Sequence, residues 1–151
     1  GVQGQMREAA ERAGVSLDYE GPEPAPEAMM WNTFDAHKLL VWAGDTHGYE
    51  RQTDLKLALF HAHFNARRPI GDRAVLLDIA EETGFERAEA GAALDSAEWA
   101  HKVRAEERAA YDLNVTGVPT MVVENAFMIP GAQSPDVYRD ALRRVAEKIP
   151  A

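Results

Sequence analysis

Residues 115–123 read Val-Thr-Gly-Val-Pro-Thr-Met-Val-Val, and this stretch decides the fold of the chain. A glycine and a proline, which mark a loop, stand directly before the β-favouring run from Thr120 to Val123. A second short run, Ala126 to Ile129, follows across the polar pair Glu124–Asn125, which suits a tight turn. The sequence therefore predicts a β-hairpin whose second strand stops at Pro130.

A helix is expected directly after the hairpin. Ser134 suits its N-cap, Pro135 its first position and Asp136 the acidic first turn. Its apolar stripe consists of Tyr138, Leu142, Val145 and Ile149. Because a lone hairpin is marginally stable in water, these elements need further strands from another segment or chain, or cover from helices.

The N-terminal part of the chain is predicted to be a helix followed by a linker. Residues 3–13 are rich in Ala, Glu and Arg, and Gly14 suits the C-terminal cap. Residues 16–20 alternate as an extended segment does, and residues 21–26 hold three prolines. The chain begins at Gly1 without an initiator methionine, so we expect a fragment or a processed chain.

From Thr33 to Leu113 the spacing of apolar residues is helical almost throughout. Thr33 is expected to cap a helix over residues 34–43, and Thr53 or Asp54 to begin the next helix. The aromatic side chains of this region are predicted to form the core between helices. They are Trp31, Phe34, Trp42, Phe60, Phe64 and Trp99.

Further helix boundaries follow from capping residues. Asp72 is expected to cap a third helix that ends at Gly84, and residues 86–93 to form a short fourth one. Asp95-Ser96-Ala97-Glu98 has the form of a capping box, which predicts that a long helix begins there.

Composition excludes several kinds of function. Of the 151 residues, 46% are hydrophobic and 27% charged, which is ordinary for a globular domain. The formal net charge of −9 argues against a nucleic-acid-binding face, and no apolar run is long enough to cross a membrane. The absence of cysteine excludes disulfides, thiolate metal sites and a cysteine nucleophile within these residues.

Four elements in order resemble the DsbA-like, thioredoxin-fold disulfide oxidoreductases of the FrnE type. Asn32-Thr33-Phe34-Asp35-Ala36-His37-Lys38 is similar to their Asn-Thr-x-x-Ala-His-Arg/Lys element. Residues 59–64, Leu-Phe-His-Ala-His-Phe, followed by Ile70-Gly71-Asp72, resemble their next helix and turn. Gly117 to Thr120 resembles their cis-proline segment, and Gly131-Ala132-Gln133 the end of their second strand.

The resemblance implies an α+β, thioredoxin-like fold with three parts. Residues 1–29 would be a helix and linker of the thioredoxin part, residues 30–113 a helical insertion, and residues 114–151 the C-terminal β-β-α portion. The family's Cys-x-x-Cys pair has no counterpart here, so no catalytic residue is expected in this chain, and the chain alone is expected to be inactive. Neither a cofactor nor a metal is expected.

The resemblance also implies a substrate-binding edge. Pro119 would be the cis-proline, and the backbone of Val118 would pair with an extended substrate strand. Thr116, Gly117 and Thr120 would flank that edge, while Asn32 and His37 would line the same cleft.

The residues alone leave simpler interpretations open. Gly117–Pro119 can be an ordinary loop with a trans proline, and Asn32 can simply cap a helix. The histidines show no ligand spacing: His61 and His63, two residues apart, fall on different faces of a helix.

Three functions remain open at this point. The chain can be a portion of a protein disulfide oxidoreductase or isomerase, with protein or small thiol and disulfide substrates. It can instead belong to the glutathione-dependent branch of 2-hydroxychromene-2-carboxylate isomerases and kappa-class transferases, or be a non-catalytic helical module that binds a protein. We expect a cytoplasmic protein that binds neither nucleic acid nor membrane and forms a homodimer or a strand-exchanged pair through its hairpin.

Overall fold

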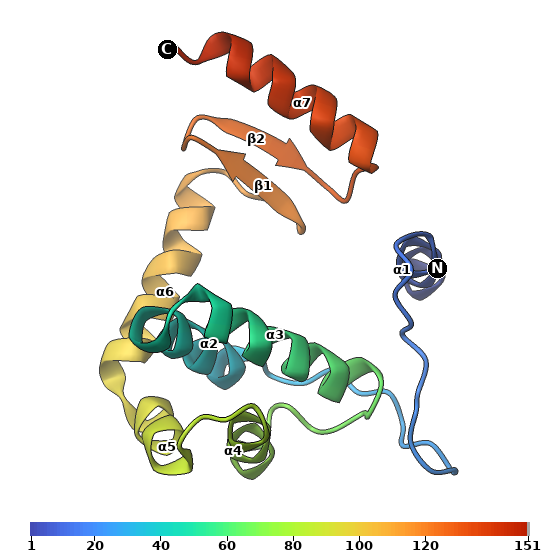
Figure 1. Ribbon diagram of the computed structural model, residues 1–151, viewed down its shortest axis with the longest axis vertical. Helices are drawn as coiled ribbons and strands as arrows, with labels where there is room; N and C mark the ends of the chain where they lie inside the picture. Colours follow the sequence, from blue (N-terminus) through green and yellow to red (C-terminus); the bar gives the residue numbers. More distant parts are fainter. Residues whose placement is uncertain (151) are drawn as a thin grey trace. The chain divides into compact units, whose positions relative to one another are not determined.

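A computed structural model describes residues 1–150, which form seven helices and one two-stranded sheet (Figure 1). The elements in chain order are α1 (Val2–Arg12), α2 (Phe34–His47), α3 (Tyr49–Phe64), α4 (Arg73–Glu82), α5 (Arg87–Asp95), α6 (Ala97–Asp112), β1 (Thr120–Val123), β2 (Phe127–Pro130) and α7 (Pro135–Lys148). No helix among the described residues has both the length and the apolar character needed to span a bilayer.

The chain divides into two compact units. We name Gly1–Arg104 the helical unit and Ala105–Ala151 the hairpin unit. The boundary between them falls inside α6, whose residues belong partly to each unit. The functional residues predicted from the sequence are distributed over both.

The core of the helical unit lies among α2, α3, α4 and α5. Helix α2 packs against α3 and α5, and α4 packs against the same two helices. Leu39, Leu55, Leu76 and Ile79 are fully buried there. Of the aromatic residues expected in the core, Trp42 is buried, whereas Phe60 is 41% exposed on the outer side of α3. That part of the expectation is wrong, because Leu59 and Ala62 supply the buried face of α3 beside it.

Some of the predicted capping signals are confirmed, whereas Ser134 occupies the N-cap position of α7 without a side-chain capping bond. The Asp72 carboxylate accepts hydrogen bonds from the backbone N–H groups of Ala74 and Val75 and so caps α4. Gly84, with φ of +89°, follows the end of that helix, as expected. Gly14, with φ of +72°, likewise follows α1.

One predicted helix start and one predicted capping motif are wrong, although α6 begins at Ala97, within the residues that predict a long helix. Helix α3 begins at Tyr49, before Thr53 and Asp54, because Gly48, with φ of +92°, separates it from α2 only one residue after that helix ends. The capping box at residues 95–98 does not form. Asp95 ends α5, and its carboxylate accepts two hydrogen bonds from the guanidinium of Arg73, at 2.7 and 3.0 Å.

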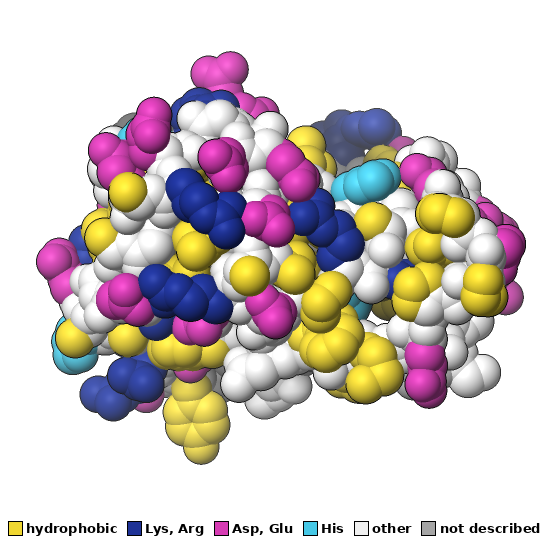
Figure 2. Space-filling view, turned by 90° about the horizontal axis from the view of Figure 1, so that it is seen from below, with side chains coloured by type: hydrophobic (Ala, Val, Ile, Leu, Met, Phe, Trp, Pro, Cys, Tyr) yellow, Lys and Arg dark blue, Asp and Glu magenta, His cyan; other side chains and the backbone are white. Residues whose placement is uncertain are grey.

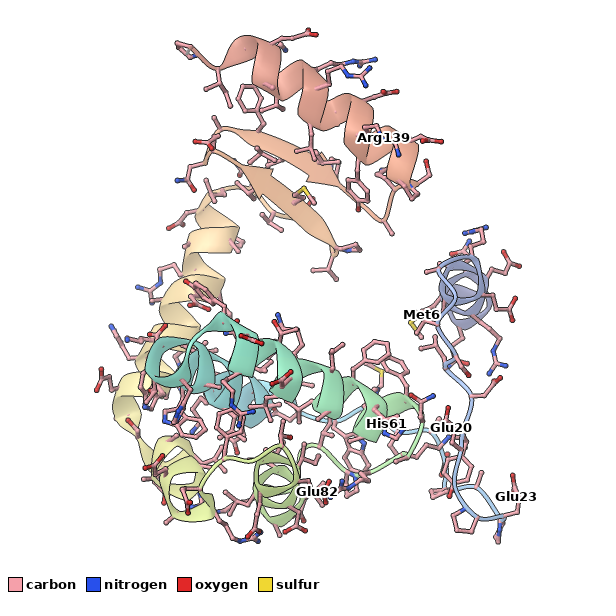
Figure 3. All side chains as sticks on the ribbon, in the orientation of Figure 1. Met6, Glu20, Glu23, His61, Glu82 and Arg139 are labelled. Atoms are coloured by element: carbon pink, nitrogen blue, oxygen red, sulfur yellow. The ribbon has the colours of Figure 1, made fainter. Side chains whose placement is uncertain are left out.

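The segment between α1 and α2 is attached to the end of α3 by a buried amide. Asn65 is 5% exposed, and its Nδ2 donates to the carbonyl oxygens of Ser16 and Asp18 at 3.1 and 2.8 Å. The backbone N–H of Glu20 donates back to the carbonyl of Asn65. Figure 3 shows the Glu20 carboxylate beside His61, where Oε2 and Nε2 are 3.3 Å apart.

The hairpin unit consists of the predicted hairpin and helix. The strands pair antiparallel, with Thr120 opposite Pro130 and Val123 opposite Phe127. Glu124 and Asn125 both have positive φ, at 52° and 53°, as the central residues of a tight hairpin turn require. Helix α7 lies along β2 and covers one face of the hairpin (Figure 1).

Charges of both signs are interspersed on the face drawn in Figure 2. The helical unit has several ion pairs, such as Arg68 with Glu82 at 2.9 Å and Arg87 with Asp78 at 2.6 Å. This face therefore carries no block of positive charge of the kind that nucleic acid requires.

Candidate functional site

The loop before β1 presents its backbone to solvent. The Val118–Pro119 peptide bond is cis, which is the geometry that the family resemblance implies. The Val118 side chain is 92% exposed, and Pro119 is also exposed. The Thr120 hydroxyl donates a 2.6 Å hydrogen bond to the Gly117 carbonyl and closes the loop across these two residues.

Hydrogen bonding in the hairpin determines which groups point outward. The Gly131 N–H donates to the Pro119 carbonyl at 2.8 Å, so this pair is hydrogen-bonded and the pairs alternate from there along the ladder. The N–H and C=O groups of Thr120 and Val122 consequently point away from β2. Val118 lies next to this edge, before the cis bond to Pro119. Since the described sheet has only two strands, this edge of β1 is open to another strand.

The other edge of the sheet is poorer in donors. There the outward-pointing residues are Met128 and Pro130, which lie opposite Val122 and Thr120. Pro130 has no N–H group, so the outer edge of β2 offers one backbone donor where β1 offers two.

A hollow of about 400 Å³ lies beside this loop. Its lining is formed by Asn114, Val115, Thr116, Gly117, Val118, Thr120, Met128, Pro130 and Gly131. The structure thus brings together four of the seven residues predicted to form the substrate-binding edge and cleft, and adds Met128 from the facing strand. Pro119, the fifth, lies between Val118 and Thr120 but does not line the hollow.

Asn32 and His37 belong to the helical unit. The Asn32 side-chain oxygen accepts a 3.0 Å hydrogen bond from the backbone N–H of Phe34, and the N-cap residue Thr33 makes no side-chain capping bond. The capping role expected of Thr33 is therefore performed by its neighbour. His37 is exposed on the first turn of α2.

The lysine of the same sequence element has a structural role that sequence reasoning missed. Lys38 is 8% exposed, and its Nζ donates to the carbonyl of Leu94 at 2.6 Å while lying 3.2 Å from an Asp35 carboxylate oxygen. It thereby satisfies a backbone acceptor in the last turn of α5. The partner lies 56 residues away along the chain, so no local pattern could have indicated it.

No group of three or more His, Asp or Glu side chains within residues 1–150 is arranged to hold a metal ion. Two of the five histidines each lie near a single carboxylate: His61 near Glu20 at 3.3 Å and His47 near Glu89 at 3.8 Å.

Comparison with known proteins gives consistent matches. A family model described as a DSBA-like thioredoxin domain matches residues 1–143. The uncharacterized protein YwbO of Bacillus subtilis is 27% identical over 141 residues, which cover 93% of this chain and 66% of that protein.

Two solved structures share the fold. The crystal structure of the probable DsbA oxidoreductase SCO1869 from Streptomyces coelicolor has a TM-score of 0.79 and 30% identity, over 94% of this chain and 58% of that one. The cytosolic disulfide reductase DsbM from Pseudomonas aeruginosa, solved with GSH, has a TM-score of 0.62 and 22% identity, over 78% and 60% of the two chains.

These matches confirm the predicted fold class, which is mostly helical, α+β and thioredoxin-like. The chain spans between 58% and 66% of the length of these three relatives.

Proposed function

The chain belongs to the family of DSBA-like thioredoxin domains, and on this premise we propose that it supplies one wall of the substrate cleft of an FrnE-type thiol–disulfide oxidoreductase. The observation that carries the proposal is the open edge from Val118 to Val122, which begins at a cis-proline and exposes backbone donors and acceptors. The redox cysteines would lie outside residues 1–151, which contain none.

In this proposal the chain holds the substrate while the cysteine-bearing part reacts. A thiolate attacks one sulfur of a disulfide, a new S–S bond forms, and the other sulfur leaves as a thiolate. An extended substrate segment can pair through its own main chain with the N–H and C=O of Val118. Because main-chain pairing does not depend on the side chains of the substrate, segments of different sequence can be held in the same way. Thr116, Gly117 and Thr120 would shape the hollow that receives the neighbouring substrate side chains.

The substrate class, the contacts from the insertion, the domain boundaries and the cellular location are part of the same proposal. Substrates would be proteins or small molecules with thiols or disulfides, and Asn32 and His37 would contact them from the insertion. The division into residues 1–29, 30–113 and 114–151 is retained as a prediction for the intact protein. A cytoplasmic location is proposed, in line with the cytosolic disulfide reductase of P. aeruginosa, which shares the fold.

Titration of the chain itself tests the binding edge. The ¹⁵N-labelled chain is mixed with a short peptide that carries a central S-methylcysteine, and the backbone amide shifts are followed by NMR. We expect the largest shifts at Thr116, Gly117, Val118 and Thr120, with the amide of Leu76 in the helical core as internal reference. Shifts at these positions no larger than at Leu76 would exclude substrate pairing at this edge.

A parallel titration with S-methylglutathione distinguishes the glutathione-dependent branch. Saturation by the tripeptide at concentrations where the longer peptide has no effect would favour that branch over a protein oxidoreductase. Reading the coding sequence upstream of Gly1 tests the missing half: a strand followed by Cys-x-x-Cys is expected there. If the full-length protein has no Cys-x-x-Cys pair, the proposed oxidoreductase function is wrong.

A further inference from the structure

The hydroxyl of Tyr138, on the first turns of α7, is joined to the segment that follows β2. It donates a 3.1 Å hydrogen bond to the carbonyl of Gly131 and accepts a 3.2 Å bond from the backbone N–H of Gln133. The side chain is half-buried against the hairpin. From the sequence, Tyr138 was expected only to be part of the apolar stripe of the helix, so its polar end had no predicted role.

The same short segment is fixed to both strands. The Gly131 N–H donates to the Pro119 carbonyl at 2.8 Å, and the Gln133 side chain donates from Nε2 to the Pro130 carbonyl at 2.8 Å. Gly131 has φ of +74°, a conformation that residues with a Cβ rarely adopt. The positive φ and these contacts give a physical reason for the glycine at 131 and the glutamine at 133.

Pro119 depends on the hydrogen bond from the Gly131 N–H more than another residue at its position would. In a hydrogen-bonded antiparallel pair, each residue donates to the other, but proline has no N–H. The pair of Pro119 and Gly131 therefore has one bond instead of two. Val118, which precedes it, is 92% exposed and gains little positional restraint from packing.

We infer that Tyr138 is a positioning residue for the edge that receives the substrate strand. Its hydroxyl restrains the Gly131 carbonyl, on one side of that residue. The Gly131 N–H, on the other side, holds the Pro119 carbonyl, and Pro119 sets the direction of the Val118 N–H and C=O. Thr120 restrains the loop from the other side through its bond to Gly117. The ligand is an extended peptide backbone. This identification of the ligand rests on the proposed function.

The test compares Tyr138→Phe with the unchanged chain. The substitution keeps the ring and removes only the hydroxyl. We expect the dissociation constant for the S-methylcysteine peptide to rise about threefold to tenfold, because one neutral hydrogen bond that orders the edge is lost. We also expect faster hydrogen exchange at the Gly131 amide and chemical-shift changes that extend from Gln133 and Ala132, next to the lost hydroxyl, to Gly117, Val118 and Thr120.

Two controls separate positioning from general loosening. Val145→Ala thins the buried packing of the same helix without removing the hydroxyl, and is expected to lower the unfolding midpoint while leaving the dissociation constant unchanged. Tyr111→Phe makes the same chemical change at a side chain that is 79% exposed in the hairpin unit, and is expected to have no effect on binding. Equal weakening by Val145→Ala and Tyr138→Phe would overturn the inference.

The outcomes also distinguish this inference from the proposed function. If the unchanged chain does not bind the peptide, the proposed function fails, and the role of Tyr138 is still judged by exchange at Gly131. If the peptide binds but Tyr138→Phe changes neither the affinity nor the Gly131 exchange, the inference fails alone. Should the variant not fold, the scalar coupling across the Gly131–Pro119 hydrogen bond in the unchanged chain decides, and its absence counts against the inference.

Discussion

At the scale of single residues, the threonine after the cis-proline combines two properties. Thr120 begins β1, for which its branched side chain is suited, and its hydroxyl closes the preceding loop onto Gly117. A valine would keep the first property and lose the second. The substitution Thr120→Val therefore isolates the contribution of the hydroxyl to the order of the loop.

We expect Thr120→Val to lower the free energy of unfolding of the hairpin unit by about 0.5–1.5 kcal/mol, the usual net value of one hydrogen bond. The amides from Thr116 to Val118 should exchange faster as the loop opens. Native-state hydrogen exchange measures both quantities, and Thr120→Ser, which keeps the hydroxyl, is the matched control. Unchanged exchange in the valine variant would show that the bond to Gly117 does not order the loop.

Asn65 is a second residue whose role depends on distant contacts. Replacing it by leucine leaves the carbonyls of Ser16 and Asp18 without their donor, which costs about 1–3 kcal/mol where such groups stay buried. We expect Asn65→Leu to detach the linker and accelerate limited proteolysis within residues 21–26. Gln5→Leu, an exposed amide on α1, should leave the cleavage rate unchanged.

The residues also show what could be predicted from the sequence. The cap at Asp72 was predictable because its partners lie two and three residues away. The roles of Asn65 and Lys38 were not, because their partners lie 47 to 56 residues away. Asp95 was misassigned for the same reason: its local pattern predicts a cap, but Arg73, 22 residues away, binds its carboxylate.

At the scale of elements, the four-helix core of the helical unit should dominate stability. Leu76 on α4 is fully buried among α2 to α5. We expect Leu76→Ala to destabilise the chain by about 2–5 kcal/mol, the range for truncating a large aliphatic core side chain. Chemical denaturation measures it, with the neighbouring but half-buried Leu77→Ala as the milder control. Equal losses for both variants would contradict the burial of Leu76.

Strand β1 is the element expected to associate with other chains. Its outward N–H and C=O groups and the exposed side chain of Val122 are features that recruit another strand. We expect sedimentation velocity to show a dimer of the chain at high concentration and Val122→Lys to shift it to monomer. Val137→Lys, which adds the same charge at an exposed position of α7, should leave the dimer intact. A chain that stays monomeric throughout would contradict the expectation.

Local pattern was sufficient for the hairpin but less so for the helices. Short β-favouring runs and the turn residues between them predicted both strands to within a residue, since the hairpin pairs residues close together in the chain. The start of α3 was missed by four residues because Gly48 allows a sharp turn between two helices with no intervening loop. The open edge of β1 could be predicted from the sequence, whereas the hydrogen bond from Tyr138 to Gly131 could be found only from the three-dimensional structure.

At the scale of the whole molecule, the two units differ in how much apolar surface they bury. The helical unit has a continuous core of fifteen buried hydrophobic residues, whereas the hairpin unit buries only Ile129 and Val145 among its described hydrophobic side chains. Burial of apolar area is the main favourable contribution to folding, so stability should be uneven along the chain.

We expect amide exchange in β1, β2 and α7 to be faster by orders of magnitude than in α2 and α4. Hydrogen exchange followed by mass spectrometry over peptides of each element measures this. Addition of a strand to β1, through a partner or the rest of the protein, should slow exchange in the hairpin. Uniform protection along residues 1–150 would show that the hairpin unit draws stability from a source other than its own core.

Pro130 has one further consequence, for the geometry of assembly. A sheet with two equally competent edges can add copies without limit and grow into a fibre, whereas a sheet with one such edge is complete after a single pairing. Because Pro130 removes a donor from the outer edge of β2, this sheet has only one fully competent edge, the outer edge of β1. Any association through the hairpin should therefore close at two copies, and raising the concentration should populate that species more fully without producing larger ones.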